Sequence, residues 1–135
     1  MKFLTKDLFL GTAPGIGKAT AIVLYSQGAS LALADLQAET LDAVPEELLK
    51  SHPEQQFSCN VVNVSGTEQV NSQIDGIVEK VGKFDGAANI AGVVRNAPLG
   101  TEITATTEDG FTFTMQINAY GVYVSIVFHY AHESL

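Results

Sequence analysis

Three glycines near the start of the chain have a spacing that suits contact with phosphate groups. Gly11, Gly15 and Gly17 follow the apolar residues 8–10 and open a helical pattern that continues to about residue 27. Glycines allow a tight turn and a close backbone approach to an anion, and the helix that begins there directs unpaired amides and a partial positive charge at it. The residues expected to line this phosphate site are Gly11, Gly15, Ile16 and Gly17.

Asp35 stands at the end of the apolar run 30–35, where the ribose of a dinucleotide would lie beside such a turn. Its carboxylate would accept hydrogen bonds from ribose hydroxyls and would repel a 2′-phosphate. Residues 12–14 carry no basic side chain that would neutralise such a phosphate. Any nicotinamide cofactor is therefore expected to be NAD rather than NADP. The alternative is that Asp35 only caps a turn, and we favour the ribose contact.

The other reactive side chains indicate less. His129 and His132 are three residues apart and Glu133 is near, but no third ligand is indicated. A surface patch is therefore favoured at this position, and no metal is expected. Cys59 lies in an apolar run and is expected to be an inert core residue.

The composition is that of a folded domain. The 135 residues include 46% hydrophobic and 16% charged side chains, with a net charge of −8 at pH 7. We therefore expect one domain over residues 1–135 with a genuine core. The negative charge argues against a nucleic acid or a membrane surface as partner, and no apolar stretch approaches the length of a membrane span. The single cysteine fits a reducing compartment, so the expected location is cytoplasmic.

Short apolar runs alternate with helical patterns along the chain, which predicts parallel strands joined by crossover helices. The expected strands are 7–10, 30–35, 57–62 and 84–88. A first helix is expected to end near residue 27, with Gly28 as its left-handed cap, and a second to span 40–51. The predicted fold class is α/β, a Rossmann-like three-layer arrangement with a partial, doubly wound parallel sheet of about four strands.

Two more helices are predicted. Ser65 and Glu68 have the spacing of a capping box, and four apolar residues after them would share one helical face. These are Val70, Ile74, Ile77 and Val81. After a polar loop or short helix over 93–106, residues 107–133 are expected to form one long helix that contains two glycines. The alternation of 111–115 also permits a local strand.

Four motifs in chain order resemble those of the short-chain dehydrogenase/reductase family. The spacing Gly-x-x-x-Gly-x-Gly at 11–17 is similar to its glycine motif, and Asn89-Ile90-Ala91-Gly92 is similar to its Asn-Asn-Ala-Gly after strand four. Asn63-Val64 resembles its Asp-Val after strand three, which contacts adenine in relatives. Asn118 resembles the helix asparagine that supports the family's proton relay. The motifs cover nearly the whole chain.

The resemblance implies the strand order 3-2-1-4 and a bound nicotinamide cofactor. The further cofactor-binding residues that it implies are Asn63, Val64, Asn89, Ala91 and Gly92. Asn118 would be the catalytic residue carried by this chain, in a vestigial or supporting role. The departures are Leu10 in place of a threonine, Asn63 in place of an acidic residue and Ile90 in place of an asparagine, which together suggest relaxed selection or a changed ligand.

The family's reaction is hydride transfer to a carbonyl or from an alcohol, assisted by a serine and by a tyrosine followed four residues later by a lysine. The sequence has no Tyr-x-x-x-Lys, and its last lysine is Lys83. The chain is therefore expected to be truncated after the helix that carries Asn118, and to be redox-silent alone.

Three classes of function follow from these features. The first is the NAD-binding part of a dehydrogenase. The second is a protein with a new, cofactor-independent role, such as small-molecule binding, isomerisation or cyclisation in an apolar pocket. The third is an interaction module. Val122, Ile126 and Tyr130, with Val124 and Phe128, put apolar side chains on more than one side of the last helix. A homo-oligomer, a dimer or larger, is therefore expected.

Overall fold

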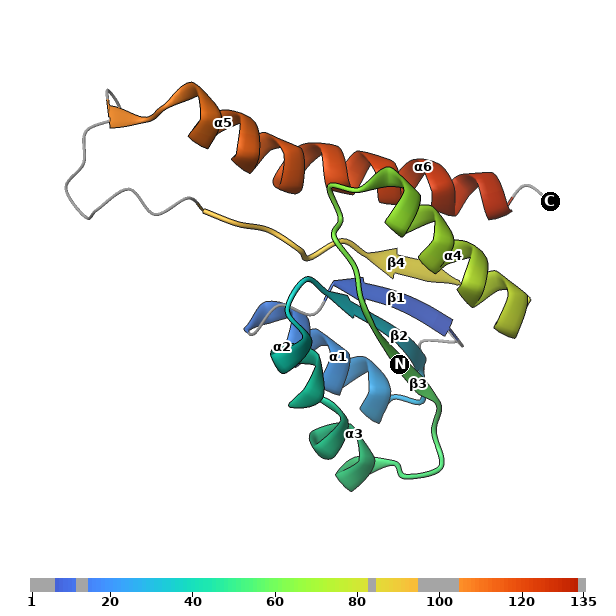
Figure 1. Cartoon of the computed structure of the whole chain (residues 1–135). Helices are drawn as coiled ribbons and strands as arrows, with labels where there is room; N and C mark the ends of the chain where they lie inside the picture. Colours follow the sequence, from blue (N-terminus) through green and yellow to red (C-terminus); the bar gives the residue numbers. More distant parts are fainter. Residues whose placement is uncertain (1–6, 12–14, 83–84, 95–104, 134–135) are drawn as a thin grey trace.

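The computed structural model describes residues 7–11, 15–82, 85–94 and 105–133, and it arranges them in three layers (Figure 1). A parallel sheet forms the middle layer. Its strands are β1 (Asp7–Gly11), β2 (Ser30–Asp35), β3 (Phe57–Val61) and β4 (Gly86–Ala88), in the order β3-β2-β1-β4. The predicted fold class and strand order are confirmed. The fourth strand, expected over 84–88, begins only at Gly86, since Asp85 precedes it and residue 84 lies outside the described residues.

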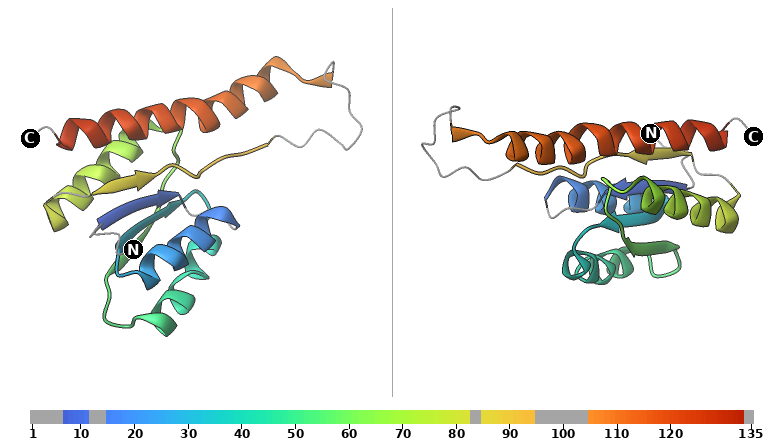
Figure 2. Two further views of the ribbon diagram at one scale, coloured as in Figure 1. Left: turned by 180° about the vertical axis from the view of Figure 1, so that it is seen from behind. Right: turned by 45° about the horizontal axis from the view of Figure 1, so that its top comes forward.

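Helices cover both faces of this sheet, as the two further views show (Figure 2). One face carries α1 (Ile16–Ser26), α2 (Ala38–Asp42) and α3 (Pro45–Ser51). The other face carries α4 (Thr67–Val81) and a long helix that consists of α5 (Glu108–Met115), a π-helical turn η2 (Gln116–Tyr120) and α6 (Gly121–Glu133). None of the described helices combines the length and apolar character needed to cross a bilayer.

The central strand β2 supplies side chains to both cores. Leu31 and Leu33 pack with Tyr25 and Leu48 on the α1–α3 face, while Ala32 and Ala34 pack on the α4–α6 face. A strand buried on both faces needs a continuous apolar run, and this explains the sequence of 30–35. The predicted bounds of β2 are confirmed.

The predicted helix over 40–51 is wrong, because two short helices stand in its place. Pro45 is at the start of α3. Proline has no amide hydrogen to donate within a helix, and its ring clashes with the preceding turn, so it suits only a first position. The chain therefore ends α2 at Asp42 and begins a new helix at Pro45. Gly28 takes its predicted left-handed conformation, with φ of 97°.

The start of α4 also differs from the prediction. The N-cap residue is Gly66, and no side chain caps the helix. Ser65 instead bonds to the preceding segment, its backbone amide and its hydroxyl both donating to Oδ1 of Asn63, at 3.0 and 2.7 Å. The apolar face is confirmed where it is described: Val70, Ile74 and Ile77 are buried. The side chain of Val81 lies outside the described residues.

The long C-terminal helix begins after Thr107, whose hydroxyl accepts a hydrogen bond from the amide of Gly110 at 3.1 Å. Residues 111–115 are helical, so the strand that their alternation permitted is absent. The prediction of one helix over 107–133 is confirmed, except that five residues within it form the π-helical turn η2. Residues 95–104 of the predicted loop lie outside the described residues.

Candidate functional site

The predicted phosphate site lies where β1 gives way to α1. Gly11 is the last residue of β1, and Gly15, with φ of 106°, is the N-cap of α1. Such a φ is strained for residues with a side chain, which accounts for a glycine at this position. Gly17 is buried, in accord with close helix–strand packing, while Ile16 is exposed at 76%. The first turn of α1 holds no acidic residue, so its electrostatics suit an anion.

Asp35 ends β2 at the same edge of the sheet and is partly exposed. Its Oδ1 accepts a hydrogen bond from the amide of Gln37 at 2.9 Å, so the side chain does cap the turn. Capping does not exclude a ribose contact, because a carboxylate has a second oxygen that can accept hydrogen bonds. The two interpretations of Asp35 are therefore compatible.

The segment after β3 is held by hydrogen bonds of Asn63. The backbone amide of Asn63 donates to Oε1 of Gln69 at 2.9 Å, and its side-chain Oδ1 accepts the two hydrogen bonds from Ser65. Oδ1 of Asn63 therefore accepts two hydrogen bonds within the chain, and the Nδ2 group is the donor that Asn63 can offer to a ligand. Val64 follows and packs against Gly121 at the start of α6.

The segment after β4 is held by Asn118. Nδ2 of Asn118 donates to the carbonyl of Val93 at 2.7 Å, and Oδ1 accepts from the amide of Val93 at 2.8 Å. Oδ1 also lies 3.4 Å from where a Cβ on Gly92 would be, so the side chain rests against the predicted Asn89–Gly92 segment. Asn118 thus ties the π-helical turn to the chain that follows β4.

These segments share one edge because all four strands are parallel and the predicted residues follow their carboxyl ends (Figure 1). The crevice outside the carboxyl ends of such strands is where open α/β sheets bind ligands. Sequence reasoning missed two residues at this edge, Val93 and Gly121. A glycine inside a predicted helix could have indicated close packing at Gly121, whereas the contact to Val93 uses backbone groups, which have no sequence signature.

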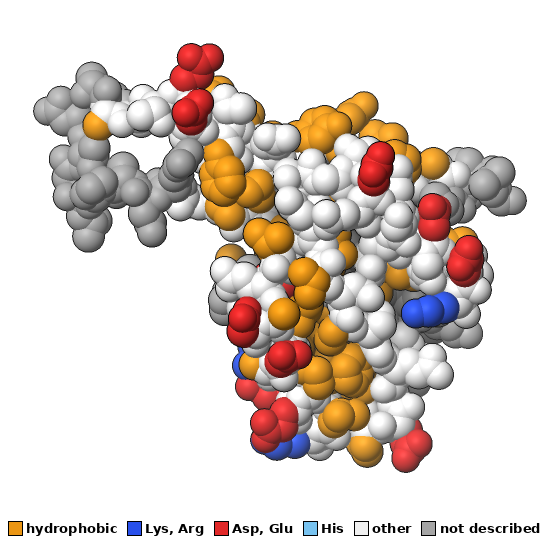
Figure 3. All heavy atoms as spheres, in the orientation of Figure 1, with side chains coloured by type: hydrophobic (Ala, Val, Ile, Leu, Met, Phe, Trp, Pro, Cys, Tyr) orange, Lys and Arg blue, Asp and Glu red, His pale blue; other side chains and the backbone are white. Residues whose placement is uncertain are grey.

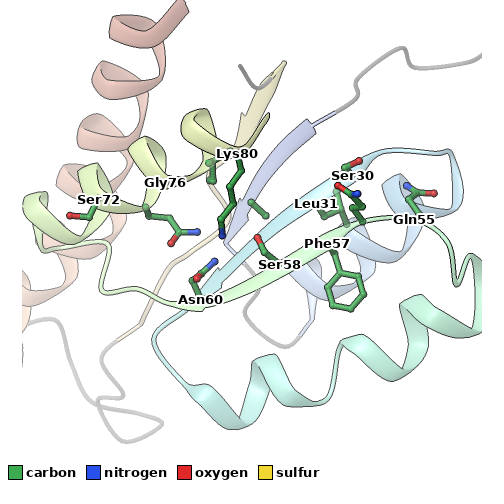
Figure 4. A pocket seen from close by; sticks show the side chains of 13 residues that line it. Ser30, Leu31, Gln55, Phe57, Ser58, Asn60, Ser72, Gly76 and Lys80 are labelled. Atoms are coloured by element: carbon green, nitrogen blue, oxygen red, sulfur yellow. The ribbon is translucent and has the colours of Figure 1, made fainter. Parts of the chain in front are cut away.

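The described residues also form hollows away from this site. A groove of about 540 Å³ lies between α4 and the strands β2 and β3, and Ser58 and Asn60 of β3 lie across it from Lys80 (Figure 4). A second, of about 800 Å³, runs along the long helix, with Phe111, Met115, Tyr120 and Tyr123 among its lining residues. No predicted cofactor-binding residue lines either of them.

Reactive side chains elsewhere offer no competing site in the described part of the chain. Cys59 is half-buried, and burial, followed by the charge of Asp42, raises the pKa of its thiol, so the thiolate is disfavoured at neutral pH. Within the described residues, no cluster of three metal-ligating side chains occurs. The side chains of His129 and His132 lie outside the described residues.

Comparison with known protein sequences identifies relatives of this chain. A family model described as enoyl-(acyl carrier protein) reductase matches residues 11–132. A chanoclavine-I dehydrogenase from Trichophyton verrucosum is 33% identical over 130 residues, which are 93% of this chain and 49% of that protein. A levodione reductase from Leifsonia aquatica is 31% identical over 119 residues, or 88% of this chain and 43% of that protein.

Solved structures show the same fold. The crystal structure of a levodione reductase matches with a TM-score of 0.80 and 28% identity, covering 90% of this chain and 46% of the other. A short-chain dehydrogenase/reductase of the glucose/ribitol dehydrogenase type from Brucella melitensis matches with a TM-score of 0.82 and 27% identity. The match covers 98% of this chain and 54% of the other. This chain belongs to the short-chain dehydrogenase/reductase family, and it spans about half the length of the curated relatives it matches.

Proposed function

We propose that this chain is an NAD-binding unit of the short-chain dehydrogenase/reductase type that does not carry out hydride transfer on its own. The observation that carries the proposal is the shared edge: the Gly15 turn, Asp35, Val64 and the Asn118-tied segment after β4 all follow carboxyl ends of neighbouring strands. When bound, the nicotinamide cofactor would supply the hydride or accept it.

Each residue has a separate task in this proposal. The amides at the start of α1, beside Gly11, Gly15, Ile16 and Gly17, would receive the pyrophosphate. Asp35 would accept from the ribose hydroxyls. Asn63 and Val64 would lie against adenine, with Asn63 donating through Nδ2. The segment of Asn89, Ala91 and Gly92 would line the other half of the cofactor, and Asn118 would fix its position.

The direct test is a calorimetric titration of the pure chain with NAD and NADP, with the mass in solution measured on the same sample. Saturable binding of NAD, weakened by Asp35→Ala, is expected. Absence of binding by both dinucleotides at millimolar concentration would remove the proposal and favour the cofactor-independent role.

A second function, self-association, is favoured by the apolar surface of the long helix. Side chains exposed along it include Phe111, Met115, Tyr123, Ile126 and Val127. Hydrophobic side chains are visible along this helix in the space-filling view, while acidic ones are scattered over the same face (Figure 3). Exposed apolar patches of this kind mark interfaces in soluble proteins. We therefore propose a homo-oligomer, and on the single cysteine a cytoplasmic location.

A further inference from the structure

The π-helical turn η2 and the residue after it contact more of the carboxyl edge than Asn118 alone does. The hydroxyl of Tyr120 lies 3.2 Å from the hydroxyl of Thr67, the first residue of α4. Gly121 packs directly on Val64, in the segment between β3 and α4. Single π-helical turns inside α-helices are frequent at functional sites. Here the turn and its neighbour meet the segments after β3 and β4.

The contact between Gly121 and Val64 is too close for a side chain at position 121 unless Val64 gives way. A Cβ added to Gly121 would lie 3.0 Å from Cγ2 of Val64 and 3.1 Å from its carbonyl oxygen. The backbone does not require glycine, because φ of −59° and ψ of −41° are ordinary helical values. Glycine weakens a helix relative to alanine. Close approach to Val64 therefore accounts for the glycine.

Among the described residues, no gap beside Gly121 is large enough to hold an added methyl group. The hollow lined by Val64, Asn89, Ile90 and Gly121 among others has a volume of about 10 Å³. This is close to the lower limit for one water molecule. A methyl group on Gly121 would therefore push Val64 away by a few tenths of an ångström, and since one of the opposing atoms is backbone, the segment itself would have to shift by that amount.

We propose that Gly121 is a positioning residue for the adenosine half of the cofactor. By lacking a side chain, it sets how closely α6 approaches the segment after β3, and thereby where Val64 stands against adenine. The inference rests on the proposed NAD-binding function. It extends that function to a helix residue that has no direct contact with the ligand in the proposal.

The test compares Gly121→Ala with Gly76→Ala, a matched control in the middle of α4 where a Cβ would meet nothing within 4 Å. The probes are 5′-AMP and NAD, titrated at a temperature at which both variants are folded. Gly121→Ala is expected to weaken both ligands by the same factor, about tenfold, because the displaced segment faces the half that they share. Gly76→Ala should change neither affinity. Unchanged AMP affinity in folded Gly121→Ala would overturn the inference.

A second variant and a hydrogen-exchange measurement complete the test. If Gly121→Ala does not fold, Val64→Ala is added to it, because alanine lacks the Cγ2 atom that makes the closest contact. Partial recovery is expected, because the contact with the carbonyl oxygen at 3.1 Å remains, and a pair that recovers no folded population at all counts against the inference. Amide hydrogen exchange over residues 62–66 is compared in the absence of ligand, with faster exchange expected in Gly121→Ala alone. If the unmutated chain binds neither AMP nor NAD, the proposed function fails, while this exchange still decides whether Gly121 positions Val64.

Discussion

The side-chain amide of Asn118 pairs with both backbone polar groups of Val93, donating to the carbonyl at 2.7 Å and accepting from the amide at 2.8 Å. One side chain thus satisfies both backbone hydrogen-bonding groups of this residue. The contact connects the π-helical turn with the segment that leaves β4. A residue that the family resemblance links to proton transfer therefore has a structural task in this chain.

Replacing Asn118 by alanine should destabilise the chain by about 1–2 kcal/mol, because two hydrogen bonds to Val93 are lost at once. The matched control is Gln116→Ala, which removes another exposed amide from the same π-helical turn. Urea denaturation followed by circular dichroism measures both variants. Equal urea midpoints for the two would contradict a structural role for Asn118.

Asp35 should make the site prefer NAD over NADP. A carboxylate at the end of β2 repels a 2′-phosphate, and Lys18 in the first turn of α1 is already paired with Glu47, with 2.6 Å between Nζ and Oε1. Asp35→Ala should reduce the ratio of NAD affinity to NADP affinity. Glu39 is an exposed acidic residue on α2, and Glu39→Ala should leave this ratio unchanged. Calorimetry with both dinucleotides decides, and tighter binding of NADPH than of NADH by the unmutated chain would refute the assignment.

The pure chain should not turn over NADH with simple ketones. Without a tyrosine–lysine pair, the substrate oxygen has no positioned proton partner, a contribution of about 10²–10⁴-fold in rate. Absorbance at the NADH band is followed over hours with a panel of ketones. Robust turnover by pure protein would be incompatible with this prediction. Activity that arises only on mixing with a full-length relative would be compatible with this prediction.

Much of the fold could be predicted because its signals are local. Residues 31–34 are all apolar since β2 is buried on both faces, and Gly28 stands where the chain needs a positive φ. Pro45 is also visible in the sequence, but the first turn of a helix tolerates proline, so one helix over 40–51 with Pro45 near its start was expected. The carboxyl-edge residues could be placed together because parallel strands align their ends.

The remaining features depend on competition between neighbouring polar groups, on small differences between backbone forms, or on contacts between segments far apart in sequence. Ser65 has the right spacing for a cap, but its hydroxyl bonds to Oδ1 of Asn63 and the helix begins one residue later, with Gly66 as its N-cap. The π-helical turn differs from an α-helix only in which carbonyl each amide meets, so side-chain periodicity does not reveal it. The closeness of Gly121 to Val64 depends on how α6 crosses the segment after β3.

Stability should fall in alkaline solution as Cys59 ionises. Burial raises the pKa of this thiol in the folded chain above its unfolded value, so the protonated thiol is favoured by folding. The contribution of the protonated thiol to the free energy of unfolding is fully present below the pKa of Cys59 in the unfolded chain. It is lost as the pH rises through the pKa of Cys59 in the folded chain. Free energies of unfolding measured between neutral and strongly alkaline pH should decline less in Cys59→Ala. Parallel declines in the two proteins would rule out this contribution.

The long helix should make the chain self-associate. Val124 is buried against the sheet side, whereas Tyr123, Ile126 and Val127 on the same helix are exposed at 62%, 42% and 42%. One sheet face therefore does not cover all of its apolar side chains, as the sequence pattern predicted. In the described sheet, β4 also lies at the end of the strand order, where a further strand could pair.

Sedimentation velocity at micromolar concentration should therefore show a dimer or a larger assembly. Ile126→Glu should shift the mass toward the monomer, because a charge on the exposed helix face would have to be buried in the interface. Leu49→Glu is the matched control, since Leu49 on α3 is exposed at 44%, close to the 42% of Ile126. It should leave the mass unchanged. A compact monomer in the unmutated chain would defeat the proposal, and an Ile126→Glu variant of unchanged mass would exclude this face as the interface.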